Sequence, residues 1–185
     1  MTTVVGVMGS ASDAAPGERD QAALTAKAAA LAQAIAERKL VLLTGTTTGL
    51  VYVVGKTAHD SGGLHVGISP ANNRAEHVDK YKLPHDACDL IVYTGFGLKG
   101  RNVVLVRSCE IVLFIAGSMG SLNEFTIAHD EGKVIGCLTG TGGVADEVDY
   151  LLQKFSKDTG ARVFQNDDPA KLIDDCLQAL PNRKL

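Results

Sequence analysis

Two ionisable residues, Arg101 and Glu124, stand at the two ends of a mostly apolar stretch. Between them, residues 111–115 have the β-branched and aromatic composition of a buried strand. A turn of small residues at 116–121 follows and leads into a helix that carries Glu124. This order is typical of phosphate sites, because a helix N-terminus offers unpaired N–H groups and the positive end of a dipole. The pattern predicts an anion site flanked by a guanidinium and a carboxylate, which are the candidate catalytic groups.

Both residues also have a purely structural interpretation. Arg101 begins an apolar helix, and a buried arginine needs an anion nearby because an unpaired buried charge is costly. A salt bridge to Asp89, Glu110 or Glu124 would supply that anion without any ligand. Ser121 and Glu124 have the spacing of a capping box, in which the glutamate only caps its own helix. The residues alone leave the capping role and the catalytic role of Glu124 equally open.

Turns of small residues follow four of the expected strands, at 9–10, 44–49, 95–100 and 117–121. In a parallel sheet such turns meet at one rim, where backbone N–H groups and hydroxyls bind oxyanions. Ordinary connecting turns are the alternative, since glycine is common wherever a turn needs positive φ. The candidate ligand-binding residues of this rim are Gly9, Ser10, Gly45, Thr46, Thr47, Thr48, Gly49, Gly117, Ser118, Met119, Gly120 and Ser121.

The alternation of buried strands with amphipathic helices predicts the fold. Strands that are apolar on both faces and alternate with helices indicate a parallel sheet covered on both sides. We therefore expect an α/β fold, a Rossmann-like doubly wound parallel sheet with helices on both faces, as a single domain over residues 1–185. The expected strands are 3–8, 40–43, 64–68, 89–93, 111–115, 133–138 and 162–164, the helices outside the central stretch are 21–38, 49–61, 144–157 and 169–180, and 71–87 is a long loop or short excursion.

Composition and missing motifs exclude several function classes. A net charge of −3 over 185 residues argues against nonspecific nucleic-acid binding. No apolar run approaches the roughly 20 residues that cross a bilayer, and no signal peptide is evident, so we expect a cytoplasmic protein without a membrane partner. The four cysteines and five histidines share no ligand spacing, so no metal site is assigned. The G-x-G-x-x-G letters at 95–100 lack the acidic residue of a dinucleotide site, and no P-loop is present.

With these residues in place, the chain resembles the "lonely guy" (LOG) family and the related molybdenum cofactor carrier proteins, a group formerly labelled lysine decarboxylases. That family carries an Arg-Lys pair, an apolar helix and strand, and then P-G-G-x-G-T-x-x-E. Here Arg101-Asn102 precedes residues 116–124, which read A-G-S-M-G-S-L-N-E. Residues 45–51 look like the family's G-G-x-x-G-L-M turn, and 62–70 are similar to its G-G-x-x-x-G-[IV]-x-P segment.

The resemblance implies that the turn at 117–121 binds a phosphate, that Glu124 contacts the ribose and that Arg101 assists charge development. LOG enzymes hydrolyse the N-glycosidic bond of nucleoside 5'-monophosphates, and they are commonly homodimers. No cofactor is required for that activity. The sequence departs from the pattern at Thr46, Asn102, Ala116, Ser118 and Ser121, and its Arg-Asn pair looks more like the carrier branch. A noncatalytic carrier or sensor of a nucleotide or molybdopterin-type ligand is therefore the alternative, and an oligomer scaffold with a decayed pocket is a third.

Overall fold

The computed structural model describes residues 2–10, 20–155 and 157–180. Seven parallel strands form one sheet in the order β4-β3-β2-β1-β5-β6-β7. The strands are β1 Val4–Gly9, β2 Val41–Thr44, β3 His65–Ser69, β4 Leu90–Tyr93, β5 Ile111–Ile115, β6 Val134–Leu138 and β7 Arg162–Asn166. The α-helices are α1 Gln21–Glu37, α2 Gly49–Asp60, α3 Gly97–Arg107, α4 Met119–Asp130, α5 Val148–Phe155 and α6 Pro169–Ala179.

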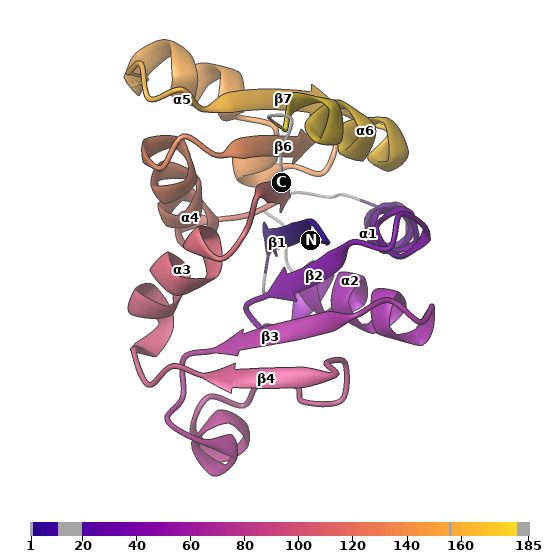
Figure 1. Ribbon diagram of the computed structural model, residues 1–185, viewed down its shortest axis with the longest axis vertical. Coiled ribbons are helices and arrows are strands. Elements are labelled where there is room, and N and C mark those ends of the chain that lie inside the picture. Colours follow the sequence, from indigo (N-terminus) through magenta and orange to yellow (C-terminus); the bar gives the residue numbers. More distant parts are fainter. Residues whose placement is uncertain (1, 11–19, 156, 181–185) are drawn as a thin grey trace.

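The helices form two layers, one on each face of the sheet (Figure 1). Helices α1, α2 and α6 cover one face, and α3, α4 and α5 cover the other. Each layer has its own apolar core, and the fully buried strands β5 and β6 contribute side chains to both. Burial on both faces explains why these strands read as continuous apolar runs rather than as alternating ones. The expected Rossmann-like α/β sheet is confirmed.

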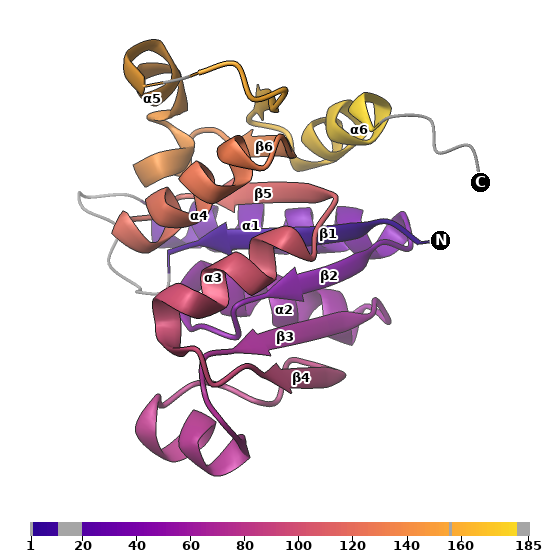
Figure 2. The ribbon, with the colours of Figure 1, turned by 60° about the vertical axis from the view of Figure 1, so that its left-hand side comes forward.

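The order in which the chain adds strands reverses at β1, the central strand of the sheet. The chain proceeds from β1 through β2 and β3 to the edge strand β4, and then crosses back by α3 to pair β5 with the other side of β1. The arrowheads of β1, β2 and β3 lie at the same edge of the sheet in Figure 2. After β1 and β5 the chain continues to opposite faces, which leaves a crevice between their carboxyl ends where ligands of such sheets bind.

Several boundaries differ from the sequence prediction. Helix α3 begins at Gly97, so Arg101 lies inside the helix rather than at its first residue. Val103 of this apolar helix is 40% exposed, so the described chain by itself does not cover every side of the helix. Residues 143–145 form a separate turn of 3-10 helix before the shorter α5.

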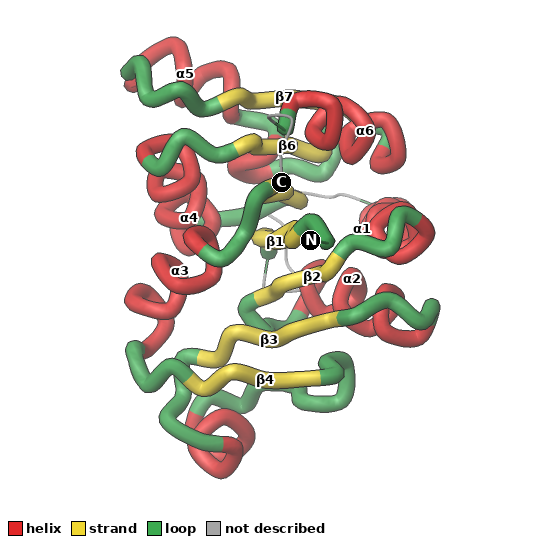
Figure 3. The backbone as a smooth tube through the Cα atoms, viewed as in Figure 1, coloured by secondary structure: helices red, strands yellow, loops and turns green. Residues whose placement is uncertain are grey.

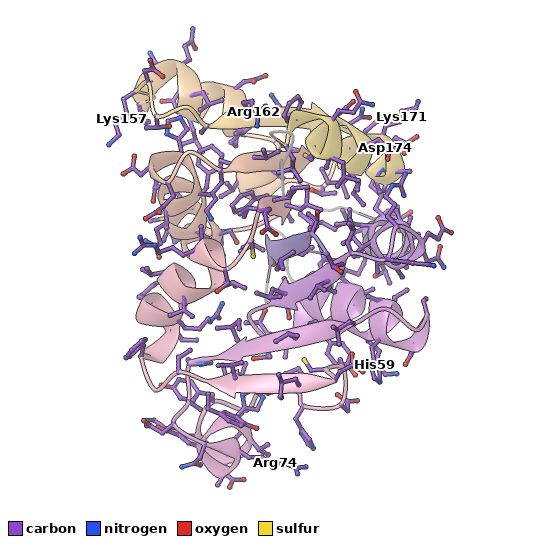
Figure 4. All side chains as sticks on the ribbon, in the orientation of Figure 1. His59, Arg74, Lys157, Arg162, Lys171 and Asp174 are labelled. Atoms are coloured by element: carbon purple, nitrogen blue, oxygen red, sulfur yellow. The ribbon has the colours of Figure 1, made fainter. Side chains whose placement is uncertain are left out.

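The segment between β3 and β4 contains one turn of π-helix, Glu76–Lys80, which the sequence did not indicate (Figure 3). The buried His77 fixes this turn: its ring nitrogens lie 2.9 Å from Ser69 Oγ and 2.9 Å from the carbonyl oxygen of Pro84. Arg74, in the same segment, points away from the sheet (Figure 4). No helix among the described residues is long and apolar enough to span a membrane.

Candidate functional site

Arg101 and Glu124 face each other across the α3–α4 interface. Arg101 Nη1 lies 3.3 Å from Glu124 Oε1, and the two residues are 4% and 7% exposed. The other two carboxylates that the sequence offers as salt-bridge partners of Arg101 accept hydrogen bonds from other residues. Asp89 accepts the backbone N–H of His65, and Glu110 accepts that of Val4. The salt bridge considered from the sequence therefore exists, and it is the one between the two candidate catalytic groups.

The Arg101 guanidinium has more donors than acceptors around it. Of its five N–H donors, only Nη1 has a hydrogen-bond acceptor among the described residues, and the buried Nε has none. Gly45, in the turn after β2, lies against the same group: a Cβ added there would stand 2.0 Å from Arg101 Nη1. Only glycine permits this approach, because real Cβ atoms do not come so close. A buried arginine with free donors at a pocket is suited to an anion.

Burial dominates the electrostatics of this pair. It raises the pKa of Glu124 to about 7, against the opposing attraction of Arg101 and Lys99. It also lowers the pKa of Arg101, which the charge of Glu124 partly offsets. A carboxylate in an ordinary salt bridge has a depressed pKa instead. Glu124 therefore changes its protonation near neutral pH, as a general acid or base must.

Asn102 completes the contacts of the carboxylate. Its side-chain amide lies 3.0 Å from Glu124 Oε1 and 2.9 Å from the carbonyl oxygen of Leu98. Both neighbours are acceptors, so the amide nitrogen faces them and donates to each. Asn102 is 4% exposed and stands where the LOG pattern has a lysine. A neutral amide holds Glu124 in place without the second positive charge that a lysine would bring.

The turn after β5 places the N-terminus of α4 at the pocket. Gly117 has φ +105°, and a Cβ there would lie 2.7 Å from Ser121 Cβ. The backbone N–H groups of Val144 and Ala145 donate to the carbonyl oxygens of Gly117 and Ala116, at 3.1 and 3.0 Å. Ala116 also adopts positive φ, 52°, although it is not glycine. These hydrogen bonds tie the turn after β5 to the 3-10 turn that follows β6.

The capping-box interpretation of Glu124 is wrong. Helix α4 starts at Met119 with Ser118 as its N-cap, so Ser121 is already inside the helix and Glu124 lies in its second turn. The Ser121 hydroxyl instead donates to the carbonyl oxygen of Gly9, at 3.1 Å, which ties α4 to the end of β1. The buried carboxylate of Glu124 faces Arg101 and Asn102, away from its own helix end.

These groups surround a cavity of about 160 Å³ at the carboxyl end of β1, lined also by the turn after β2 and by the first turns of α3 and α4. Arg101 and Glu124 both line it, together with six of the residues that the sequence predicted for ligand binding. The predicted residues in the lining are Gly9, Gly45, Thr47, Ser118, Gly120 and Ser121, and the others are Val7, Met8, Val51, Leu98, Lys99 and Asn102.

The remaining predicted residues lie beside the cavity rather than in its lining: Ser10, Thr46, Thr48, Gly49, Gly117 and Met119. Thr46 adopts positive φ, 55°, and its buried side chain faces β3, where a Cβ on Gly67 would stand 2.2 Å from Thr46 Cγ2. Met119 is 76% exposed. No group of three or more His, Cys, Asp or Glu side chains in the described ranges is arranged to hold a metal ion.

Lys99 and Asn102 are the polar lining residues that the sequence reasoning missed. Both belong to α3, which was expected to start at Arg101, after the glycine-rich run at 95–100. Their spacing of three residues was the available signal, because residues i and i+3 share one face of a helix. Once α3 is started at Gly97, Lys99 and Asn102 fall on a common face toward α4.

Known proteins resemble the chain at both sequence and structural levels. A model of the SLOG cluster4 family matches residues 2–173. A protein of Archaeoglobus fulgidus is 34% identical over 104 residues, a match that covers 56% of this chain and 63% of that protein. The chain thus spans less than two thirds of the length of this relative.

Two solved structures share the fold over nearly their whole length. The protein TM1055 superimposes with a TM-score of 0.80 at 23% identity, covering 96% of this chain and 99% of that one. The molybdenum cofactor binding protein from Rippkaea orientalis superimposes with a TM-score of 0.74 at 26% identity, covering 98% of this chain and 99% of that one. These findings support kinship with LOG-type and molybdenum cofactor carrier proteins and give no support to the older lysine decarboxylase label. Because the family model covers almost the entire sequence, the chain belongs to the SLOG cluster4 family.

Proposed function

We propose that the chain binds a phosphorylated small molecule at the Arg101–Glu124 pocket and acts as a carrier or sensor of it. The ligand would be a molybdopterin-type cofactor or a nucleotide. The observation that carries this proposal is the guanidinium of Arg101, which lines the cavity and donates to one acceptor, Glu124 Oε1, among the described residues. The remaining donors at the end of the guanidinium can pair with an anion in the cavity, and a charge-assisted hydrogen bond of this kind is stronger than a neutral one. The first turn of α4 would supply further N–H donors to the same anion.

The size of the cavity fits a charged headgroup rather than a whole ligand. At about 160 Å³ it is smaller than the roughly 300–1,000 Å³ of pockets that enclose drug-sized molecules. The body of a nucleotide or pterin would therefore lie over the rim. Leu98 and Met119, 49% and 76% exposed, supply apolar surface there. A ligand that is held by its head and left accessible at the other end suits a carrier, which must pass its cargo on.

The protein from Rippkaea orientalis gives this proposal its support from relatives. It is described as a molybdenum cofactor binding protein and covers nearly the same chain length. Asn102 in place of a lysine points in the same direction, because an amide holds Glu124 but adds no charge for catalysis.

Isothermal titration calorimetry tests the proposal with molybdopterin, AMP and inorganic phosphate as separate titrants. Saturable binding of at least one of them by the wild-type protein is expected, together with its loss in Arg101→Met. The matched control is Arg107→Met, at the exposed end of the same helix, which should bind like the wild type. If the wild-type protein binds none of the three titrants, the proposal is wrong.

A second candidate function is hydrolysis of the N-glycosidic bond of a nucleoside 5'-monophosphate. The observation that favours it is the pKa of Glu124, raised to about 7 by burial. The protonated carboxyl would donate its proton to the departing base, and the carboxylate left behind would stabilise the positive charge that develops on the ribose until water adds to it. Arg101 would hold the phosphate end and fix the distance between Glu124 and the scissile bond.

Incubation of the pure protein with AMP separates the two candidates, with free adenine measured by chromatography. The hydrolase predicts adenine release that Glu124→Gln abolishes while AMP binding persists. The carrier predicts AMP or molybdopterin binding without release of base. Full activity of Glu124→Gln would reject the catalytic role of this carboxylate.

A further inference from the structure

Lys99 is a second cation at the pocket, and the proposed headgroup site does not yet account for it. It is the third residue of α3 and lines the cavity. Its Nζ lies 3.7 Å from the position that a Cβ on Gly120 would take, next to the first turn of α4. Within the described ranges, Lys99 forms no hydrogen bond or ion pair, although its charge reaches Glu124. The ammonium group is therefore available to a ligand.

The charges around the cavity do not balance. Arg101 and Glu124 form an ion pair with each other, which largely neutralises both. Lys99 is then an uncompensated positive charge, and the N-terminus of α4 beside it adds the positive end of a dipole. An ion with one negative charge satisfies Lys99 but leaves the free Arg101 donors and the helix end without an anionic partner. A dianion compensates all three.

We propose that Lys99 determines specificity, making the pocket select a terminal phosphate monoester over a phosphodiester. This inference rests on the proposed headgroup site. A phosphate monoester carries a charge close to −2 above its second pKa of about 6, whereas a diester carries −1. The free oxygens of a monoester accept from Arg101 and from the α4 backbone, with Lys99 on the open side. In a diester, one of these oxygens bears a second substituent, which occupies the position next to the ammonium.

The experiment compares AMP with its 5'-phosphate methyl ester at pH 8, by calorimetry in low salt. The variants are Lys99→Gln, Lys99→Arg and the control Lys154→Gln, which removes the same charge from α5, outside the pocket lining. In the wild-type protein we expect AMP to bind at least about tenfold more tightly than the methyl ester. A charge-assisted contact supplies about 1.5–3 kcal/mol, or roughly tenfold or more in affinity.

Lys99→Gln should weaken AMP binding by about tenfold while barely changing the affinity for the ester, so that the preference collapses. Lys99→Arg should keep the preference for AMP over the ester, and Lys154→Gln should match the wild type. Raising the salt concentration should weaken AMP binding more in the wild type than in Lys99→Gln, because salt screens the contact between Lys99 and the phosphate, which the variant lacks. An unchanged preference in Lys99→Gln would overturn the role of Lys99 but not the headgroup site. Failure of the wild type to bind AMP, its ester, inorganic phosphate and molybdopterin would instead overturn the headgroup site.

Discussion

The raised pKa of Glu124 predicts that this residue makes the folded chain less stable as pH rises. The pKa moves from 4.5 to about 7 on folding, because burial disfavours the charged carboxylate more than Arg101 favours it. Between these values the folded chain holds a proton that the unfolded chain has released. Each pH unit in this window then costs the folded state about 1.4 kcal/mol, and the whole window costs about 3 kcal/mol. The contribution is intact below pH 4.5 and is lost as pH passes 7.

Glu124→Gln isolates this effect, because the amide cannot ionise and has nearly the same shape. Urea unfolding at pH 5, 6, 7 and 8 gives the free energy of unfolding of both proteins. The wild-type value should fall relative to the variant by about 2.5 kcal/mol between pH 5 and pH 8. Other titrating groups are common to both proteins and cancel in the difference.

A structural salt bridge between Arg101 and Glu124 would produce the opposite sign. A carboxylate stabilised by its arginine has a depressed pKa, so the wild-type protein would gain stability over Glu124→Gln as pH rises. A difference that is constant across the range, or that grows with pH in favour of the wild type, would refute the reasoning. It would show that attraction to Arg101, not burial, governs the carboxylate.

Three further predictions concern the same pocket. Gly45→Ala should weaken binding of the phosphorylated ligand at least about tenfold in calorimetry, because its Cβ displaces the Arg101 guanidinium, while circular dichroism remains native. Gly117→Ala should lower the free energy of unfolding by about 3 kcal/mol, since it adds a clash to positive φ, whereas Gly62→Ala, at positive φ with open space around it, should cost only about 1 kcal/mol. Ligand binding at pH 7.5 should take up protons, because an adjacent anion raises the pKa of Glu124 further, and calorimetry in buffers of different ionisation enthalpy should show this in the wild type but not in Glu124→Gln.

The fold was predictable because its signals are local and repeated. The β5 bounds, 111–115, follow from an uninterrupted apolar run that two helix layers bury. The meeting of turns 9–10, 44–49 and 117–121 at one rim follows from parallel pairing alone, since the carboxyl ends of such strands share an edge. The pairing of Arg101 with Glu124 was one of several alternatives, and only the packing of α3 on α4 decides among them.

What the sequence could not supply depends on where helices start and where side chains point. Glycines at 95–100 indicated a turn, yet Gly97 and Gly100 lie in the first turn of α3, which brings Lys99 onto the helix and into the pocket. The hydroxyl of Thr46 predicts an anion ligand, but a left-handed backbone turns its side chain toward β3. Such conformations are set by tertiary contacts rather than by residue type.

The energetics of the Arg101–Glu124 pair distinguish a functional site from a structural one. Two charges removed from water by the α3–α4 interface lower the stability of the chain unless their mutual attraction and further hydrogen bonds offset the lost solvation. Here the attraction is incomplete: the contact is 3.3 Å, one buried nitrogen has no acceptor in the described part of the chain, and the carboxylate is easier to protonate than in water. Replacing such a buried pair by well-packed apolar residues is often neutral or stabilising. An anionic ligand would supply the missing interactions, so the unmet donors of Arg101 would themselves be a source of affinity for the proposed phosphate group.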